Sequence, residues 1–185
     1  MLLNFLRNFL ILRTQNSCLV SAVRAVKNGE WGTWVPMWLC GPEVAESTVG
    51  IIGLGRIGFS VAKRVRGFGI KRLLYQDVVE LPHAKEVNAE YVNMETLLKE
   101  SDFVIACCNL TESTHHLFRA ETFQKMKNTA VVVNISRGGV VNQADLYKAL
   151  KEGQIRAAAI DVTDPEPMSP SDPLLTVSIS SNYHI

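Results

Sequence analysis

The feature that most constrains this fold is a glycine-rich turn set between an apolar run and an amphipathic run. Residues 53–58 read GLGRIG and match the pattern G-x-G-x-x-G. The string follows a predicted strand and opens a predicted helix. This context favours a turn that binds a nucleotide over a glycine turn that binds no ligand. Gly53 then allows the tight turn, Gly55 lets the backbone approach a pyrophosphate, and Gly58 lets the helix pack closely on the strand. The turn predicts dinucleotide binding at a helix amino terminus.

Such a site needs an acid at the end of the second strand, where it binds the adenosine ribose hydroxyls. Counted on from the turn, the expected position is close to Gln76, and Asp77 is its neighbour. A site for NADP would instead want an arginine or lysine just beyond, to pair with the 2′-phosphate. Val78 and Val79 follow Asp77, and the next basic residue is Lys85. Taken alone, these residues favour NAD.

The rest of the chain alternates between buried strands and helices. Apolar runs of strand length are predicted at 49–52, 71–76, 103–110, 129–136 and 155–162, with a weaker strand at 89–92. Helices are predicted at 57–69, 94–102, 120–126 and 142–154. Strands that are apolar on both faces and alternate with helices indicate a parallel sheet covered on each side. The predicted fold class is therefore α/β, a doubly wound parallel sheet of the Rossmann type.

Composition limits the other functions open to the chain. Hydrophobic residues make up 47% and charged residues 20% of the 185 residues, which are values of a globular domain with a real core. The formal net charge of +1 comes without a basic block, so nothing suggests nucleic-acid binding. None of the four cysteines stands in a C-x-x-C pair, which predicts a reducing compartment without disulfides or a zinc site. No apolar stretch is long enough to cross a membrane, and we expect a cytoplasmic location.

The first residues differ in character from the rest. Residues 1–29 hold no acid, while arginines and a lysine are spread along them, and apolar residues recur at helical spacing from Leu2 to Leu10. A basic, acid-free amphipathic start is typical of a mitochondrial presequence. An ordinary helix, or a start produced by an incomplete gene model, are the alternatives.

Charged residues follow two of the predicted strands. Arg137 stands at the end of the valine-rich strand, beside two glycines. In open parallel sheets ligands bind at that edge, and an arginine there can hold a substrate carboxylate with two parallel hydrogen bonds. Asp161 ends the next strand and Glu166 follows in the string DVTDPEP. An acid at this edge either contacts a nicotinamide or orients a catalytic histidine; the alternative is a strand-end cap and a solvated loop residue.

Three strings carry a family resemblance: STVGIIGLGRIG, NISRGGVVNQADLYKAL and AAAIDVTDPEP. They resemble the D-2-isomer-specific 2-hydroxyacid dehydrogenases, with the animal reductases of glyoxylate and hydroxypyruvate closest. The resemblance runs from about Val26 to Leu175. It implies that Arg137 binds the substrate carboxylate and that Glu166 is the acid paired with a catalytic histidine. It further implies that cofactor or substrate contacts come from Gly55, Arg56, Ile57, Asn109, Ile135 and Asp161.

The chain also departs from the family. Members begin with a substrate-binding domain, whereas here almost nothing precedes the cofactor domain. We therefore expect a truncated chain, weakly active or inactive alone, with a divergent amphipathic segment at 1–25, an NAD(P)-binding domain at 26–176 and a divergent tail at 177–185. The family histidine lies in a P-H-I-G-like motif. His184 is either that histidine or a chance residue of the tail, and a spacing one residue short from Thr176 favours chance.

The resemblance implies reduction of glyoxylate or hydroxypyruvate to a D-2-hydroxy acid. The closest reductases prefer NADPH, which conflicts with the valines after Asp77, so the cofactor stays NADP or NAD. The expected partner is a small 2-oxo acid, with no nucleic acid, no membrane and no metal. A homodimer through the Trp31–Cys40 region is also implied. The alternative function is a non-catalytic dinucleotide-binding module, similar to the corepressors of the same family.

Overall fold

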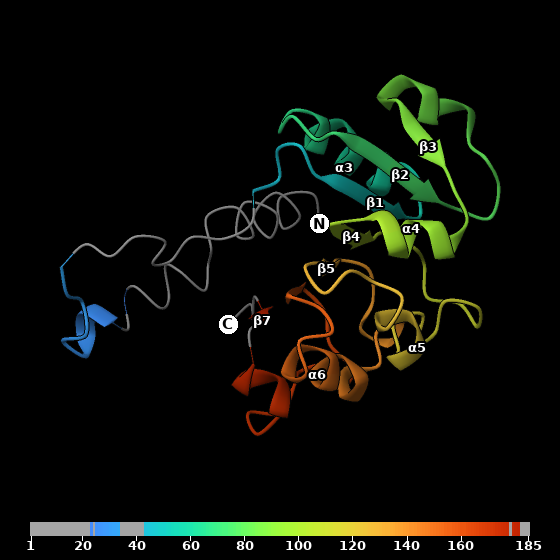
Figure 1. Ribbon diagram of the computed structural model, residues 1–185. Helices are drawn as coiled ribbons and strands as arrows, with labels where there is room; N and C mark the ends of the chain where they lie inside the picture. Colours follow the sequence, from blue (N-terminus) through green and yellow to red (C-terminus); the bar gives the residue numbers. More distant parts are fainter. Residues whose placement is uncertain (1–22, 24, 34–42, 178, 182–185) are drawn as a thin grey trace.

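The computed structural model describes residue 23 and residues 25–33, 43–177 and 179–181 (Figure 1). These residues build a sheet in the order β3-β2-β1-β4-β5-β6-β7, and every pairing is parallel. The strand order runs outward from β1 in both directions, which confirms the doubly wound α/β fold. The strands are β1 (Thr48–Ile52), β2 (Arg72–Gln76), β3 (Ala89–Tyr91), β4 (Phe103–Ala106), β5 (Val131–Asn134), β6 (Ala157–Ile160) and β7 (Ile179–Ser181).

Helices cover both faces of the sheet, so most strand residues are buried. On one face, alternate residues such as Ile51 and Val133 pack against α3 (Arg56–Arg66) and the 3₁₀ helix η1 (Pro82–Val87). On the other face, Ile52 and Val132 belong to a core shared with the remaining helices. Those helices are α4 (Met94–Glu100), α5 (Ala120–Phe123), η2 (Gly138–Val140), α6 (Gln143–Lys151) and η3 (Pro173–Thr176). This arrangement explains why the strands are apolar runs rather than alternating ones.

Short polar residues set several helix ends. The side chain of Asn93 accepts a hydrogen bond from the N–H of Thr96 at the start of α4, and Asn142 caps α6 in the same way. α3 ends at Arg66 with Gly67 as its C-cap, so of the two glycines that could close the helix predicted at 57–69, Gly67 and Gly69, the first closes it. Gly153, just beyond α6, has φ +68°, a backbone conformation that favours glycine.

Two expectations about the strands need correction. The apolar run 103–110 is a strand only over its first half, because β4 ends at Ala106. Cys107 and Cys108 therefore follow the strand and are partly buried, rather than being buried strand residues. The sheet also continues past residue 176, where β7 pairs with β6. The sequence showed no strand there, since ISS is a short and weakly apolar run.

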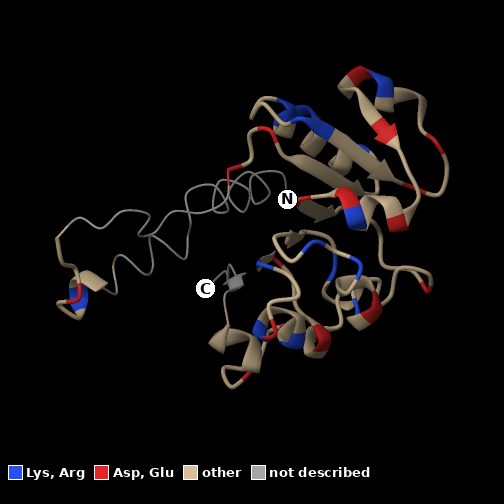
Figure 2. Cartoon of the chain, in the orientation of Figure 1, with Lys and Arg blue, Asp and Glu red and all other residues tan. Residues whose placement is uncertain are grey.

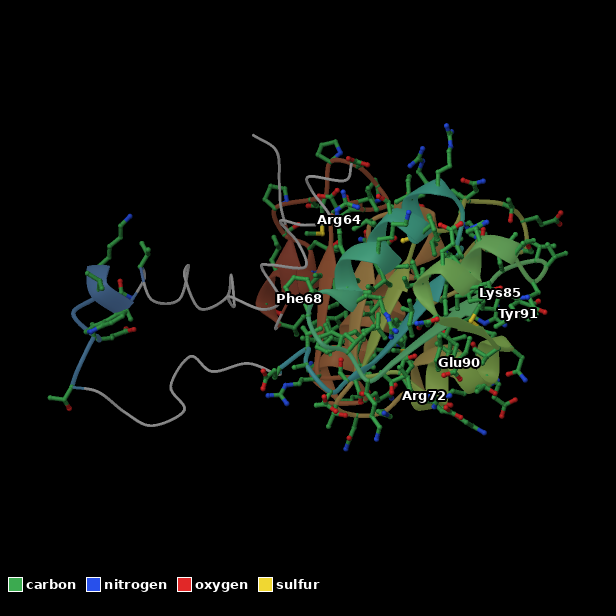
Figure 3. The ribbon with its side chains drawn as sticks, turned by 90° about the horizontal axis from the view of Figure 1, so that it is seen from above. Arg64, Phe68, Arg72, Lys85, Glu90 and Tyr91 are labelled. Carbon is green, nitrogen blue, oxygen red and sulfur yellow. The ribbon has the colours of Figure 1, made fainter. Side chains whose placement is uncertain are left out.

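The edge of the sheet beyond β2 is fixed by an ionic cluster around Arg72. Its guanidinium donates to Glu90 of β3 at 2.7 Å and also to Glu100 of α4. Figure 3 shows Arg72 beside Glu90, and Figure 2 shows acidic and basic residues on this part of the chain. The hydrogen bonds raise the pKa of Arg72, and the bond from Arg72 lowers the pKa of Glu90. Because such pairs are partly exposed, we expect this cluster to align the strands more than to stabilise the fold.

No helix in the described residues is long and apolar enough to span a membrane. The amphipathic segment at 1–25 lies almost wholly outside the described residues, as does most of the Trp31–Cys40 region.

Candidate functional site

The residues that directly follow five neighbouring strands stand level at one edge of the sheet. They follow the last paired residues of β2, β1, β4, β5 and β6, and the backbone N–H groups of the four that follow β1, β4, β5 and β6 continue the ladder. The N–H of Gly53 donates to Gln76 at 2.8 Å, and that of Asp161 donates to Asn134 at 3.0 Å. The five residues are Asp77, Gly53, Cys107, Ile135 and Asp161. The chain leaves β1 toward β2 on one side and returns to β4 on the other, so this edge includes the switch point where ligands bind in such sheets.

The glycine turn lies at that switch point, and at two of its positions a larger side chain would clash with the backbone. Gly53 has φ +88°, and a Cβ there would lie 2.9 Å from the backbone of Cys108. A Cβ on Gly58 would lie 1.9 Å from the carbonyl oxygen of Gly53. Both contacts are with backbone, which cannot move aside without distorting the turn. The predicted roles of Gly53 and Gly58 therefore have a steric basis in the structure.

Gly55 differs, because the space where its Cβ would lie is open. Apart from its two chain neighbours, no described residue has a heavy atom within 4 Å of that position. Gly55 is the N-cap of α3, and the helix has neither a side-chain cap nor an acid in its first turn. Arg56 is exposed and Ile57 half-buried. The first N–H groups of α3 thus face open space without a competing carboxylate, which is the arrangement that binds phosphate.

The turn is held from the side by the segment after β2. Asp77 follows the last residue of β2, and its Oδ2 accepts a hydrogen bond from the N–H of Leu54 at 2.8 Å. On the other side of the same residue, Nε2 of His83 lies 2.9 Å from the carbonyl oxygen of Leu54. Because both backbone polar groups of Leu54 are engaged, the phosphate-facing backbone begins at Gly55. No pattern in the sequence pointed to His83, which lies between the strands predicted at 71–76 and 89–92.

These features fit a dinucleotide. The open position at Gly55 and the uncapped start of α3 would take the pyrophosphate. Asp77 stands where a carboxylate reaches the adenosine ribose, and each of its oxygens keeps a free acceptor site besides its present hydrogen bond. The residues of this edge therefore fit a bound dinucleotide, the cofactor that the fold implies.

A second loop of the same edge, after β5, carries Arg137. Asn134 is fully buried and organises the loop: it accepts from the N–H and Oγ of Ser136, and its amide donates to the carbonyl oxygen of Arg137. Arg137 itself is exposed, and its Nη1 donates to the carbonyl oxygen of Ser136 at 2.8 Å. The remaining N–H groups of the guanidinium make no hydrogen bond to a described residue, so they can bind a carboxylate.

The loop after β6 packs directly against the Arg137 loop. A Cβ on Gly138 would lie 2.0 Å from the carbonyl oxygen of Thr163, so only glycine permits this contact. The N–H of Asp164 also donates to the side chain of Gln143 at 2.7 Å. Asp161 is half-buried at the start of this loop, and Glu166 is exposed within it. The structure thus brings the loops of Arg137, Asp161 and Glu166 together.

The loop after β4 approaches from the opposite side. The N–H of His116 donates to the carbonyl oxygen of Gly139 at 2.8 Å. The N–H of Phe118 donates to the carbonyl oxygen of Val140 at 3.0 Å. Asn109 is exposed at the start of this loop, and its carbonyl oxygen accepts from Oγ1 of Thr114 at 2.6 Å. Ile135 is buried at the end of β5. Asn109 therefore follows β4, and Ile135 and Arg137 follow the adjacent β5, at the same edge of the sheet.

Two site expectations concern features beyond this edge. His184 lies outside the described residues, so the structure neither places it at the edge nor away from it. In the part of the chain that is described, no group of three or more histidine, cysteine or acidic side chains could hold a metal ion.

The thiols at the end of β4 are held in their neutral form. Burial raises the pKa of Cys107 from an ordinary 9.0 to about 12, and burial also raises the pKa of Cys108. A thiol whose pKa is raised by folding stabilises the fold below its ordinary pKa, and this contribution is lost as the pH rises toward the folded value. Between pH 9 and 12 we expect the free energy of unfolding to fall further in the wild type than in Cys107→Ala. Chemical denaturation over that range measures it, and parallel curves would contradict the burial of this thiol.

Comparison with known proteins agrees with this geometry. Residues 11–180 match the sequence model described as D-isomer specific 2-hydroxyacid dehydrogenase, NAD binding domain. The chain belongs to the D-isomer specific 2-hydroxyacid dehydrogenases. The glycine turn, Asp77 and the Arg137 loop lie within the matched residues. The match confirms that the sheet is an NAD-binding domain.

The chain has relatives in mammals. It is 52% identical to the glyoxylate reductase/hydroxypyruvate reductase of Mus musculus and 51% identical to that of Homo sapiens. Each alignment covers 90% of this chain and 51% of the relative, so the chain spans about half the length of the curated relatives it matches. The crystal structure of a protein from Thermus thermophilus superimposes with a TM-score of 0.89 and 34% identity, over 100% of this chain and 57% of that one.

Proposed function

We propose that the protein reduces small 2-oxo acids, glyoxylate and hydroxypyruvate above all, to D-2-hydroxy acids with NADH or NADPH. The observation that carries the proposal is Arg137, which stands on the same sheet edge as the open helix start at Gly55. The names of the mouse and human relatives support this substrate class. A cation beside a dinucleotide site suits a substrate whose carboxylate neighbours the reacting carbonyl.

The glycine turn and Asp77 would hold the cofactor in a fixed position. The N–H groups at the start of α3 bind the pyrophosphate, and Asp77 accepts hydrogen bonds from ribose hydroxyls. Asn109, Ile135 and Asp161 follow β4, β5 and β6, farther along the same sheet edge, and would contact the nicotinamide half. When bound, the reduced nicotinamide supplies a hydride to the carbonyl carbon.

Arg137 would bind and polarise the substrate. Its guanidinium offers a planar fork that fits a carboxylate with two parallel hydrogen bonds. The same positive charge stabilises the negative charge that develops on the carbonyl oxygen. The bond from Nη1 to Ser136 restricts the rotation of the guanidinium, which reduces the entropy lost on binding.

The carbonyl oxygen must also receive a proton. We assign this step to a histidine held by Glu166, with His184 as the candidate in this chain. Glu166 makes no ion pair with a described residue and is exposed, so its carboxylate can accept a hydrogen bond from an imidazole. A carboxylate in this role orients the ring and stabilises its protonated form.

The proposal is tested by cofactor oxidation. We expect the purified chain to catalyse at least weak oxidation of NADH or NADPH when glyoxylate or hydroxypyruvate is added, and to leave either cofactor unchanged without substrate. The D-isomer of the product is identified by chiral chromatography. Cofactor binding without oxidation by any small 2-oxo acid would contradict the proposal and favour a non-catalytic dinucleotide-binding module.

We also propose that two copies of the chain associate. The described residues before the sheet expose large apolar side chains: Val26 is 60% and Trp31 52% exposed. Aromatic side chains in such positions are enriched at protein interfaces. Light scattering at increasing protein concentration should give the mass of a dimer, and a constant monomer mass would contradict this.

We propose that the protein is located in the cytoplasm. Cys107 and Cys108 are free thiols, as is usual in a reducing environment. A carboxyl-terminal fluorescent fusion should distribute through the cytoplasm, whereas accumulation in mitochondria would identify residues 1–25 as a presequence.

A further inference from the structure

His83 of η1 makes a hydrogen bond to the glycine turn. Its Nε2 lies 2.9 Å from the carbonyl oxygen of Leu54, and because a carbonyl oxygen only accepts, Nε2 carries the hydrogen and donates. We propose that His83 is a positioning residue for the cofactor: it holds the peptide between Leu54 and Gly55 so that the N–H of Gly55 is turned to the pyrophosphate. The inference rests on the proposed function only in that a dinucleotide occupies the turn.

The geometry of the peptide bond links these two groups. The bond between Leu54 and Gly55 is trans, so its carbonyl oxygen and its N–H point in opposite directions within one plane. A hydrogen bond that draws the carbonyl oxygen of Leu54 toward η1 therefore turns the N–H of Gly55 away from η1. This N–H makes no hydrogen bond to a described residue, and it directly precedes the first N–H groups of α3. It is thus available to a phosphate oxygen.

Two side chains fix the two peptides on either side of Leu54. Asp77 accepts from the N–H of Leu54 at 2.8 Å, which fixes the peptide between Gly53 and Leu54. His83 fixes the next peptide. Without His83 that peptide is free to turn over, because the φ of Gly55, now −65°, would become positive and glycine tolerates a positive φ. The carbonyl oxygen of Leu54 would then face the phosphates and repel them.

The packing of η1 holds the imidazole of His83 in place. Ala84, the next residue, is buried in the core that α3 shares with the sheet. Just before the helix, the N–H of Leu81 donates to the hydroxyl of the fully buried Tyr75 at 2.9 Å. The ring of His83 also meets the ring of Phe59 edge to face, with the centroids 4.9 Å apart. The donor is therefore presented at a fixed position against the turn.

The two contacts of His83 predict different effects. The ring contact with Phe59 joins η1 to α3, whereas the hydrogen bond to Leu54 selects the orientation of a peptide that faces the cofactor. One hydrogen bond of this kind changes an equilibrium by about 10-fold. We therefore expect a variant without the donor to bind NADH about 10-fold more weakly, even where the aromatic ring is kept.

The test compares two variants that each keep one of the contacts. His83→Phe keeps a ring beside Phe59 and has no donor, whereas His83→Gln has no ring and keeps an N–H donor on a side chain of similar reach. The full chain is titrated with NADH and followed by the fluorescence of the reduced nicotinamide. We expect the dissociation constant to rise about 10-fold in His83→Phe and to stay close to the wild type in His83→Gln.

Urea denaturation shows whether each variant is folded. If His83→Phe does not fold, His83→Ala takes its place, because it also lacks the donor. His83→Ala and His83→Gln both lack the ring, so the expected difference of about 10-fold between them again reports the hydrogen bond alone.

Partial ligands locate the effect along the cofactor. ADP contains two phosphates, whereas adenosine has none. In competition with NADH, we expect His83→Phe to bind ADP about 10-fold more weakly than the wild type and to bind adenosine equally well. An equal loss for adenosine would overturn the inference, because His83 would then act on the adenosine part of the site.

The other contrary results separate the inference from the proposed function. Wild-type affinity for NADH in His83→Phe, or an equal loss in His83→Phe and His83→Gln, would overturn the inference and leave the proposed function standing. Failure of the folded wild type to bind either NADH or NADPH would overturn both.

Discussion

Replacing Gly58 by alanine is expected to lower the free energy of unfolding by about 3 kcal/mol and to remove cofactor binding. The added methyl group would lie 1.9 Å from the carbonyl oxygen of Gly53 and 3.0 Å from its carbonyl carbon. Both atoms belong to a turn that is fixed by the ladder bond from Gly53 to Gln76 and by the bond from Leu54 to Asp77. The first turn of α3 must therefore move away from β1, and the N–H groups that would face the pyrophosphate move with it.

Gly55→Ala is the matched control, because it adds the same methyl group in the same turn. The space at Gly55 is open and its φ of −65° suits alanine, so the fold should keep its stability. The methyl group would occupy the approach of the pyrophosphate, and we expect a loss of cofactor affinity without a loss of stability. Urea denaturation and cofactor titration separate the two effects. Wild-type stability in Gly58→Ala would contradict the packing of α3 on β1.

Arg137→Met is expected to reduce turnover of glyoxylate by about 10³-fold, the loss found when a group that stabilises developing negative charge is removed. Methionine keeps an unbranched side chain but has no donor for the substrate carboxylate. Because the Arg137 side chain is exposed and bonds only to the carbonyl oxygen of Ser136 among described residues, stability should change by no more than about 0.5 kcal/mol. Arg137→Lys keeps the charge without the planar fork, and its activity should be intermediate.

The control for Arg137 is another exposed arginine of the same sheet. Arg156 directly precedes β6, at the end of that strand opposite to Asp161, and its N–H donates to Ala130 at 2.9 Å. Arg156→Met removes one positive charge far from the edge that carries the site. We expect its turnover and cofactor affinity to match the wild type. Equal losses in both variants would show that net charge, and not the position of Arg137, governs the reaction.

Much of the fold could be predicted because buried parallel strands leave a strong pattern. Runs such as VVVN and AAAI are apolar on both faces, and the residue after each is placed at the sheet edge by the parallel register. Asp77 illustrates this: β2 ends at Gln76, so the acid stands at the predicted end of the strand. The glycine turn was equally predictable, since two of its glycines are required by backbone contacts that other residues would break.

Features that depend on tertiary contacts could not be predicted. His83 binds the glycine turn through a segment that has no regular pattern, and the buried Asn134 holds the Arg137 loop with bonds that depend on its place in the fold. Cys107 and Cys108 continue the apolar run of β4, so the sequence alone cannot show where pairing stops. The roles of Glu166 and His184 stay predictions, because they depend on a histidine outside the described residues.

The central claim is that the glycine turn and the start of α3 form a dinucleotide site in this chain. Calorimetric titration of the purified chain with NADH tests it most directly. We predict saturable binding at one site per chain, and its loss in Gly55→Ala at unchanged stability. A folded chain that binds neither NADH nor NADPH would contradict it.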